Sequence, residues 1–342
     1  MTTYELVLVG FGNVGRRFVD LLDEKRAALG QKGVATRIAG IVTRHHDCAW
    51  NGRAVPFRGV DTVVDFVSRG ATAAREGRLV LVETTTLDIA RGEPAVTHVR
   101  AGLAGGAHVI TANKGPAAFA CHELAEAARR AGRHFLFEGA VMDGVPIFNL
   151  ARETLPLVDI SGFRGVVNTT TNYILTAMEE GQAFADALAE MQAMGVAEAD
   201  PALDLDGWDA AAKTAALANA LLGARMTPHQ VEREGITPGT GQRAREARQS
   251  GRRLKLVARA GRIDGGPGGP GGIGARVGLE ELPEDDLLAS VEGRQNAIVF
   301  HTDLVGEIAV VQRGSGLTQT AYALLADLLA ISARTATPRA RA

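Results

Sequence analysis

The segment YELVLVGFGNVG, residues 4–15, constrains the fold more than any other part of the chain. Tyr4 to Gly10 is a short, dense apolar run, which is typical of a buried strand in a parallel sheet. The next stretch, Asn13 to Leu29, carries apolar residues at helical spacing, and Gly30 is a natural stop for that helix. The segment therefore predicts a strand that passes through a glycine turn directly into a helix.

The same alternation continues along the first part of the chain. Apolar runs that predict strands occupy residues 37–43, 78–85, 107–113 and 134–140, and helix-like segments lie near 60–69, 94–105 and 116–131. Alternating strands and helices are the sequence form of an α/β fold with a doubly wound parallel sheet. We expect this domain to span residues 1–137.

The pattern changes after residue 137. A strand, a polar turn and a helix are predicted within 162–180, further helices at 183–195 and 208–223, and strands in 254–263, 295–305 and 306–314. The last two strands predict a hairpin that turns near Val305–Gly306. We expect a mixed α+β domain over 138–316 and a final helix at about 317–333 that packs back on the first domain. The glycine- and proline-rich stretch 265–272 predicts a surface loop.

Composition excludes several classes of function. The 342 residues carry a formal net charge of −2, which gives no overall field that would attract nucleic acid or an anionic membrane. The two cysteines form no CxxC or zinc pattern, and their number suits a reducing compartment. We find no secretory leader and no run of about 18 apolar residues that would span a membrane. We therefore expect a cytoplasmic protein whose partner is a small molecule.

The glycines of GFGNVG fit the turn that binds the pyrophosphate of a dinucleotide. Gly10 permits the tight turn, Gly12 lets a phosphate approach the backbone, and Gly15 lets the helix pack close to the strand. The helix N-terminus also offers free N–H groups to phosphate oxygens. An ordinary glycine turn is the alternative, but the strand before the motif and the helix after it favour nucleotide binding.

The end of the second predicted strand bears on the choice of cofactor. An acidic residue there would hydrogen-bond the adenosine ribose of NAD, whereas this chain has Thr43 and Arg44. Arginine can pair with a 2′-phosphate and stack on adenine, so Arg44 favours NADP(H). The alternative is an exposed loop arginine without a ligand.

Three polar groups outside the glycine turn are candidates for chemistry. Asp209 and Lys213 share one face of a predicted helix, either as a solvated ion pair or, as the apolar helix around them favours, as a pair directed into a cleft. Lys114 follows a strand of the first domain, where ligands of open α/β sheets bind, but a lysine in solvent fits the same pattern. The segment 168–175, NTTTNYIL, either caps a helix or holds the polar end of a small substrate.

The chain resembles the homoserine dehydrogenases in five segments that stand in the family's order and spacing: VGFGNVG, TANKGP, FEGAVMDGVP, NTTTNYIL and GVAEADPALDLDGWDAAAK. The likeness runs from about residue 5 to about residue 330 and is most specific in the last segment. It implies a Rossmann-type NAD(P)-binding domain, a substrate-binding and dimerisation domain, and a homodimer. The implied reaction is the NAD(P)-dependent interconversion of L-homoserine and L-aspartate 4-semialdehyde, on the route to threonine and methionine. A dehydrogenase of another small amino aldehyde, or an NAD(P)-binding regulator without catalysis, is the alternative.

The resemblance also implies roles for individual residues. Lys213, Lys114 and Asp209 match catalytic positions, with Lys213 as the proton donor, and the substrate-binding positions match Glu198, Asp209, Thr170 and Lys114. The cofactor-binding positions match Gly10, Phe11, Gly12, Asn13, Val14, Gly15, Arg44, Thr84, Thr85, Lys114, Gly195 and Gly314. A site for Na⁺ or K⁺ matches Glu138 and the backbone carbonyl groups of Val141, Asp143 and Val145, whose oxygen atoms suit such a cation. For Glu138, a carboxylate that caps nearby N–H groups is the alternative.

The chain departs from the family pattern at several positions. Thr169 stands where the family commonly has glycine, Val196 stands where a tyrosine is frequent, and a glycine-rich turn near the C-terminus retains only Gly314 and Gly316. No segment resembles the C-terminal regulatory module that many members carry. We therefore expect no strong inhibition by threonine through such a module.

Overall fold

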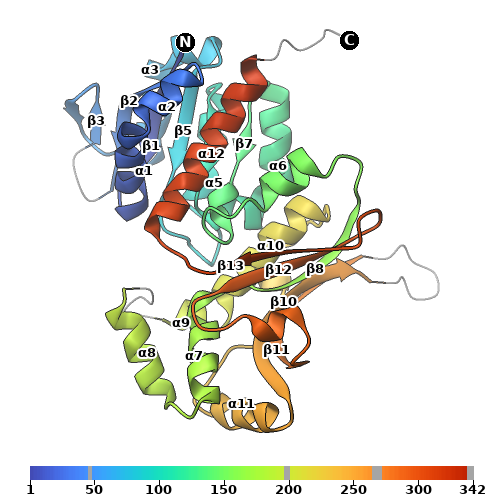
Figure 1. Cartoon of the computed structure of the whole chain (residues 1–342). Coiled ribbons are helices and arrows are strands. Elements are labelled where there is room, and N and C mark those ends of the chain that lie inside the picture. The colour runs from blue at the N-terminus through green and yellow to red at the C-terminus, as the bar shows by residue number, and fades with distance from the viewer. Residues whose placement is uncertain (45–47, 196–200, 264–271, 337–342) are drawn as a thin grey trace. The chain divides into compact units, whose positions relative to one another are not determined.

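The computed structural model describes residues 1–44, 48–195, 201–263 and 272–336 and divides the chain into two compact units. The first unit contains Met1–Phe148 together with the C-terminal segment from Gly316, and the second contains Asn149–Ser315. Each unit is built around a sheet of its own (Figure 1). The sequence pattern alone indicates a boundary at residue 137, about a dozen residues earlier.

The sheet of the first unit has the strand order β4-β3-β2-β1-β5-β6-β7 within the described residues. Its strands are β1 (Thr2–Val9), β2 (Val34–Val42), β3 (Cys48–Trp50), β4 (Arg53–Val55), β5 (Leu79–Glu83), β6 (His108–Thr111) and β7 (Phe135–Leu136). Strands β2, β1, β5, β6 and β7 are parallel to their neighbours in this group. At one edge, β3 pairs antiparallel with β2 and β4 pairs antiparallel with β3. The strand order reverses at β1, and ligands of such sheets bind at the carboxyl ends of the strands around this point. The predicted doubly wound sheet is confirmed.

Helices cover both faces of this sheet. They are α1 (Asn13–Glu24), α2 (Arg26–Gln31), α3 (Val60–Arg69), α4 (Ala71–Arg75), α5 (Ala95–Ala104), α6 (Lys114–Ala131) and α12 (Leu317–Ala336). Val7 packs with residues of α3, α5 and α6 in one apolar cluster, and the alternate residues Leu6 and Leu8 pack with residues of α1 and α12 in another. Burial on both faces explains why β1 reads as a continuous apolar run.

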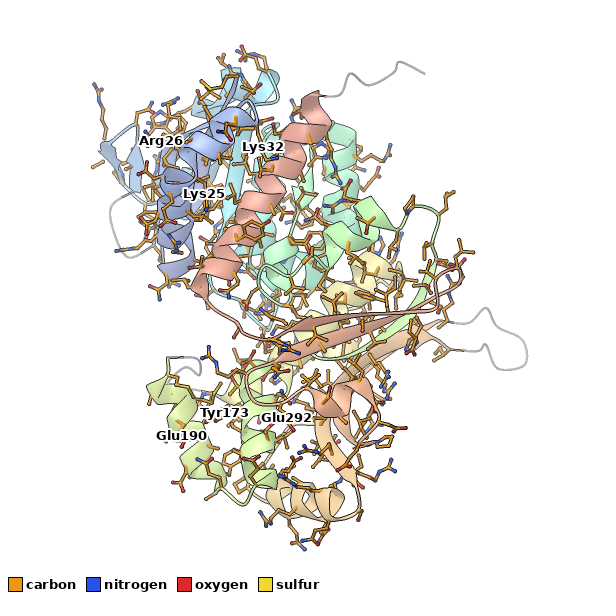
Figure 2. All side chains as sticks on the ribbon, in the orientation of Figure 1. Lys25, Arg26, Lys32, Tyr173, Glu190 and Glu292 are labelled. Atoms are coloured by element: carbon orange, nitrogen blue, oxygen red, sulfur yellow. The ribbon has the colours of Figure 1, made fainter. Side chains whose placement is uncertain are left out.

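The first predicted helix, residues 13–29, is wrong as a single helix. The chain leaves helical geometry at Lys25, with φ −99° and ψ 8°, and α2 begins at Arg26 (Figure 2). Gly30 lies inside α2 and does not end it. The break brings Leu29 into the apolar cluster that also contains Leu22 and Val34, so packing overrides the helical spacing.

The second unit contains a mixed sheet with the strand order β13-β12-β8-β10-β11-β9 within the described residues. Its strands are β8 (Ile160–Val166), β9 (Glu232–Arg233), β10 (Arg252–Arg262), β11 (Ile273–Pro283), β12 (Asn296–Thr302) and β13 (Glu307–Gln312). All neighbours pair antiparallel except β9 and β11. The predicted hairpin is the β12–β13 pair, which confirms the turn expected near Val305–Gly306.

The helices of the second unit are α7 (Thr169–Glu179), α8 (Phe184–Ala193), α9 (Ala202–Leu205), α10 (Trp208–Leu221) and α11 (Thr240–Gln249). Short helical turns of other types occur at Leu150–Thr154, Pro228–Gln230 and Leu287–Ser290 in this unit and at Glu138–Ala140 in the first unit. Helix α10 contacts β10 and β11, and its alanines, such as Ala211 and Ala215, are fully buried. Small side chains let this helix lie close to the sheet. The same packing fixes the backbone that carries Asp209 and Lys213.

Candidate active site

Gly10 forms the turn at the end of β1. Its φ of +87° is a conformation that other residues rarely adopt, and a Cβ atom there would lie 2.8 Å from the carbonyl carbon of Thr84. The Thr84 hydroxyl donates a 2.9 Å hydrogen bond to the Gly10 carbonyl oxygen. Glycine is therefore required here because the turn lies directly against the end of β5.

The other two glycines of the motif have different surroundings: Gly12 faces open space, whereas Gly15 packs closely against the turn. A Cβ atom at Gly12 would meet no atom within 4 Å, whereas one at Gly15 would lie 3.0 Å from the Gly10 carbonyl oxygen. Gly12 precedes α1 and supplies no side-chain cap to it. A phosphate group fits this open space because the N–H groups of the first helical turn need acceptors. The turn therefore fits the pyrophosphate of a dinucleotide.

The remaining first-unit residues of the predicted cofactor site surround this turn. Asn13 is exposed at the start of α1, Val14 is half-buried, and the Arg16 guanidinium lies over the Phe11 ring at 5.5 Å. Thr84 and Thr85 follow β5 directly and are half-buried. Structural proximity thus groups these residues, although they come from two separate parts of the sequence.

Arg44 is exposed two residues after the end of β2. The last residue of that strand, Val42, accepts a 2.9 Å hydrogen bond from the Gly10 N–H, so β2 ends beside the glycine turn. Gly195 and Gly314, in contrast, are exposed residues of the second unit. The structure thus groups Arg44 with the glycine turn, whereas Gly195 and Gly314 belong to the other unit and their part in cofactor binding stays a prediction.

Lys114 is the first residue of α6 rather than a residue at a strand end. Strand β6 ends at Thr111, and Asn113 caps the helix by accepting a 2.8 Å hydrogen bond from the Gly115 N–H. Pro116 lies in the first turn, where proline is tolerated. The Lys114 backbone is therefore fixed by a helix cap at the carboxyl end of the sheet, and its side chain is half-buried.

The second unit brings together a compact cluster of polar side chains from α7, α9 and α10. The Lys213 ammonium lies 2.8 Å from Asp209 Oδ2 and donates a 2.7 Å hydrogen bond to the Val167 carbonyl oxygen. Asn168 Nδ2 donates to both Asp209 Oδ2 (2.9 Å) and Asp204 Oδ1 (2.7 Å), and the Thr170 hydroxyl donates to Asp204 Oδ2 (2.8 Å). We call these five side chains, Asn168, Thr170, Asp204, Asp209 and Lys213, the polar cluster.

The polar cluster is not a solvated helix surface. The side chains of Lys213 and Asp209 are only 15% and 14% exposed. Asn168 also caps α7, because its Oδ1 accepts a 2.8 Å hydrogen bond from the Thr171 N–H. The helix cap predicted for NTTTNYIL is therefore present at Asn168, which also donates to two carboxyl groups, and substrate binding by this segment stays a prediction.

Asp204 belongs to the cluster, although the sequence analysis assigned it no role. Burial raises the pKa of its carboxyl group, and the Asp209 carboxylate raises it further, against the hydrogen bonds from Thr170 and Asn168. The position was missed because Asp204 lies on the separate short helix α9, so helical spacing relative to Asp209 gives no signal. The run of acidic residues in DLDGWD was the signal that could have found it.

Two further positions bear on the substrate side of the site. Glu198 and Val196 lie outside the residues that the structure describes. Thr169, which replaces a common glycine of the family, is the first residue of α7, and its hydroxyl accepts a 2.9 Å hydrogen bond from Asn296 Nδ2. The extra side chain is therefore held by the sheet of the second unit.

The residues of the predicted cation site form one turn in the first unit. Glu138 is almost fully buried, and its Oε1 accepts a 2.8 Å hydrogen bond from the Phe148 N–H. The backbone between them adopts positive φ at Met142 (54°) and Asp143 (53°), and the Asp143 carboxylate accepts a 3.0 Å hydrogen bond from the Thr320 hydroxyl. Glu138 lies in a short 3₁₀ turn and not at a strand end, so the strand predicted over 134–140 is too long.

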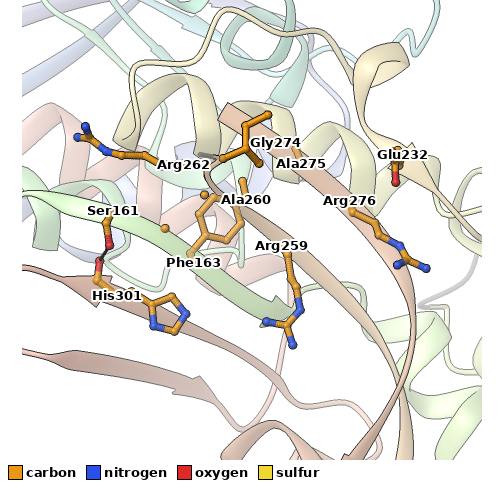
Figure 3. A pocket seen from close by; sticks show the side chains of 13 residues that line it. Ser161, Phe163, Glu232, Arg259, Ala260, Arg262, Gly274, Ala275, Arg276 and His301 are labelled. Carbon is orange, nitrogen blue, oxygen red and sulfur yellow. Dashed lines mark hydrogen bonds between the residues drawn. The ribbon is translucent and has the colours of Figure 1, made fainter. Parts of the chain in front are cut away.

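The described residues contain few features of other kinds of site. No group of three or more His, Cys, Asp or Glu side chains is placed to hold a metal ion, and none of the described helices is long and apolar enough to cross a membrane. A hollow on the sheet of the second unit is lined by Ser161, Arg259, Arg262, Arg276 and His301, among others (Figure 3). It contains none of the predicted site residues.

The two candidate catalytic lysines belong to different units. Lys114 is part of the first unit and Lys213 of the second. Their convergence on one substrate stays a prediction.

Comparisons with known proteins agree with the division into two units. A family model described as the NAD-binding domain of homoserine dehydrogenase matches residues 10–138, and one described as homoserine dehydrogenase matches residues 146–329. The NAD(+)-dependent homoserine dehydrogenase of Pseudomonas canavaninivorans is 37% identical over 97% of each chain, and the homoserine dehydrogenase of Methanocaldococcus jannaschii is 35% identical over 96% of this chain and 98% of its own. The crystal structure of a homoserine dehydrogenase from Thiobacillus denitrificans matches with a TM-score of 0.81 and 31% identity, covering 100% of this chain and 76% of that one.

Proposed function

The chain belongs to the homoserine dehydrogenase family, and from this premise we propose how its own residues carry out the reaction. It is an oxidoreductase acting on a CH–OH group, with an NAD-binding domain. The substrate pair that we propose is L-homoserine and L-aspartate 4-semialdehyde. The buried polar cluster around Lys213 and Asp209 is the observation that supports this most directly.

Lys213 donates a proton to the substrate oxygen when the aldehyde is reduced and takes it back in the reverse reaction. When bound, the reduced cofactor would supply hydride to the aldehyde carbon, and in the reverse direction the oxidised cofactor would accept hydride from the alcohol carbon. Lys213 donates to the Val167 carbonyl and pairs with Asp209, and these two contacts orient its Nζ atom. An ammonium group has three N–H donors, so Nζ can hold both oxygens and deliver a proton to a developing alkoxide.

Carboxyl groups bind the polar end of the substrate. Asp209 has this role in our proposal together with Glu198, and Thr170 orients the site by bonding Asp204. Carboxylates favour a protonated amino group through charge-assisted hydrogen bonds, which are stronger than neutral ones. Lys114 completes the catalytic set from the first unit, at the edge of the sheet where the glycine turn lies.

We propose NADP(H) as the favoured cofactor because of Arg44. An exposed arginine just beyond β2, beside the glycine turn, suits the 2′-phosphate of that cofactor better than it suits the ribose hydroxyl of NAD. The relative from Pseudomonas canavaninivorans is named for NAD(+) dependence, so the two cofactors must be compared directly.

We also propose that the turn between Glu138 and Phe148 binds Na⁺ or K⁺ through Glu138 and the carbonyl oxygens of Val141, Asp143 and Val145. Two consecutive non-glycine residues of this turn, Met142 and Asp143, adopt positive φ, which is uncommon. Replacing K⁺ and Na⁺ by choline at constant ionic strength is expected to lower the melting temperature as well as the activity. An unchanged melting temperature would count against the site.

A homodimer and a cytoplasmic location complete the proposal. The second unit supplies the sheet for dimerisation in our proposal, which rests on the family likeness. Both cysteines, Cys48 and Cys121, are free and buried, which suits a reducing compartment. Light scattering on the purified protein tests the dimer.

One assay tests the central proposal. The purified protein is given homoserine with NADP⁺ or NAD⁺, and aspartate 4-semialdehyde with NADPH or NADH, and absorbance of the reduced nicotinamide is followed. We expect turnover in both directions, with higher kcat/KM for the NADP(H) pair. Turnover only with another amino aldehyde would indicate a different dehydrogenase, and tight NADPH binding without any turnover would indicate a regulator.

A further inference from the structure

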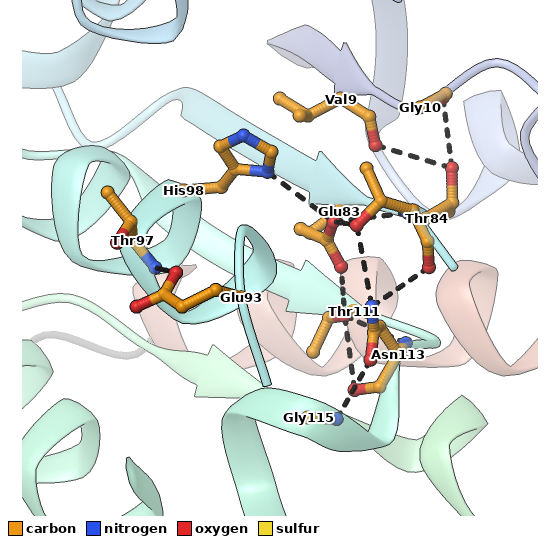
Figure 4. A network of polar contacts seen from close by, with 11 residues as sticks. Val9, Gly10, Glu83, Thr84, Glu93, Thr97, His98, Thr111, Asn113 and Gly115 are labelled. Atoms are coloured by element: carbon orange, nitrogen blue, oxygen red, sulfur yellow. Dashed lines mark hydrogen bonds and ion pairs between the residues drawn. The ribbon is translucent and has the colours of Figure 1, made fainter. Parts of the chain in front are cut away.

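A buried polar network lies beneath the carboxyl edge of the first unit's sheet. It consists of Glu83, Thr85, His98, Thr111 and Asn113, which we call the Glu83 network. Figure 4 shows Glu83, His98, Thr111 and Asn113 of this network. Glu83 is the last residue of β5, and its side chain has no exposed surface. Burying a carboxyl group costs folding free energy unless hydrogen bonds satisfy both of its oxygens. A buried glutamate at this edge of the sheet therefore suggests a specific role.

Both oxygens of the Glu83 carboxyl group are bonded. Oε1 accepts a 3.1 Å hydrogen bond from the Thr85 N–H and another from the Thr85 hydroxyl, and Oε2 accepts a 3.1 Å bond from the Thr111 hydroxyl. His98 Nδ1, from α5, lies 3.6 Å from Oε1, which is too long for a hydrogen bond. One side chain therefore connects the ends of β5 and β6.

On the β6 side, the network reaches Lys114. The Thr111 hydroxyl oxygen accepts a 2.9 Å hydrogen bond from the Asn113 N–H, and Asn113 Nδ2 donates a 2.9 Å bond to the Thr85 carbonyl. Asn113 Oδ1 then caps α6, whose first residue is Lys114. The position of the Lys114 backbone thus depends on groups that Glu83 holds.

On the β5 side, the network reaches the glycine turn. Thr84 lies between Glu83 and Thr85, and its hydroxyl donates to the Gly10 carbonyl oxygen. A Cβ atom at Gly10 would lie 2.9 Å from the Thr85 nitrogen, the same nitrogen that donates to Glu83 Oε1. A shift of the Thr84–Thr85 backbone would therefore press directly on the turn that we propose to bind the cofactor.

We propose that Glu83 is a positioning residue that fixes the glycine turn and Lys114 in position relative to each other. It touches neither substrate nor cofactor in this proposal and acts through Thr85, Thr111 and Asn113. The inference rests on the proposed roles of the glycine turn and Lys114. Its effect is on geometry at the carboxyl edge of the sheet, so it must alter cofactor binding and turnover and not stability alone.

The test compares Glu83→Gln with a matched control, Glu179→Gln. Glu179 is also a buried carboxylate, but it belongs to the second unit and pairs with Arg253. Each variant is measured for cofactor Kd by binding fluorescence, for kcat and KM, and for melting temperature. We expect both variants to melt earlier, whereas only Glu83→Gln raises the cofactor Kd and lowers kcat, by up to about 100-fold as for a displacement near 1 Å.

A second pair of variants covers the case in which Glu83→Gln does not fold. Thr111→Val removes the hydroxyl that joins Glu83 to Asn113, and Thr111→Ser keeps it. We expect Thr111→Val to weaken cofactor binding and turnover and Thr111→Ser to restore both. Wild-type cofactor Kd and kcat in folded Glu83→Gln or Thr111→Val, or equal losses in Glu179→Gln, would overturn the inference.

The cofactor Kd separates this inference from the proposed function. A wild-type protein that binds the cofactor but does not turn over homoserine would refute the proposed function. The effect of Glu83→Gln on the cofactor Kd would still decide the positioning role.

Discussion

Lys213 Nζ lies 2.8 Å from Asp209 Oδ2, one helical turn before it on α10, and both side chains are largely buried. This pair makes the first prediction. Lys213→Ala is expected to reduce kcat by roughly 10²–10⁴-fold, because it removes the proton donor, while cofactor binding stays at the wild-type level. Initial rates and a cofactor titration on the same preparation measure both quantities. A folded variant with undiminished kcat would refute the assignment.

The raised pKa of Asp204 predicts a pH-dependent stability. Burial and the nearby Asp209 carboxylate disfavour the ionised form of Asp204 in the folded state. The contribution of Asp204 to stability is therefore greatest below its unfolded pKa, near 3.8, and is lost as pH rises through its higher folded pKa. Asp204→Asn carries no such charge. Its melting temperature relative to wild type is therefore expected to rise from pH 4 to pH 7. A constant difference across this range would contradict the direction of the shift.

The two glycines of the cofactor turn predict different outcomes. Gly10→Ala places a Cβ atom against the Thr84 carbonyl at positive φ and is expected to cost roughly 1–3 kcal/mol of stability as well as cofactor affinity. Gly12→Ala meets no protein atom within 4 Å, so its melting temperature is expected to equal that of wild type while cofactor affinity falls. Thermal melts with and without cofactor measure both effects. Unchanged cofactor affinity in Gly12→Ala would show that the open space is not the phosphate site.

Arg44 predicts a selective effect on the cofactor. Arg44→Ala is expected to raise KM for NADP⁺ by roughly tenfold, the loss of one charge-assisted hydrogen bond, and to leave KM for NAD⁺ unchanged. Arg130→Ala is the matched control, because Arg130 is an exposed arginine near the C-terminal end of α6. Equal effects on the two cofactors, or a similar effect in the control, would remove Arg44 from the cofactor site.

The first unit was predictable because its signals are local. Tyr4 to Val9 is buried on both faces, which produces an apolar run that can be read directly, and the glycine turn follows in sequence. Strands β3 and β4 were missed because each has three residues, too few for a period. The break at Lys25 was missed because the packing of Leu29, rather than local spacing, determines it.

The candidate site was only partly predictable. Asp209 and Lys213 lie four residues apart, so helical spacing joins them, but the bonds from Asn168 and Thr170 to Asp204 connect residues more than thirty positions apart. The Glu83 network shows the same limit. Thr111 and Asn113 belong to the segment TANKGP, residues 111–116, whereas Glu83 stands at the end of the separate apolar strand 79–83, so the sequence gives no sign that they meet.

The return of α12 to the first unit has a consequence for how the protein is made. Leu324 and Leu328 of this helix share an apolar cluster with Leu6 and Leu8 of β1, so the sheet face that α1 also covers stays partly exposed until residues 317–336 have left the ribosome. During synthesis the nascent chain carries the entire second unit, Asn149–Ser315, as an insertion before its N-terminal half can close its own core. Truncation shortly before α12 would therefore expose apolar residues of β1, at the N-terminal end of the chain, rather than residues close to the truncation.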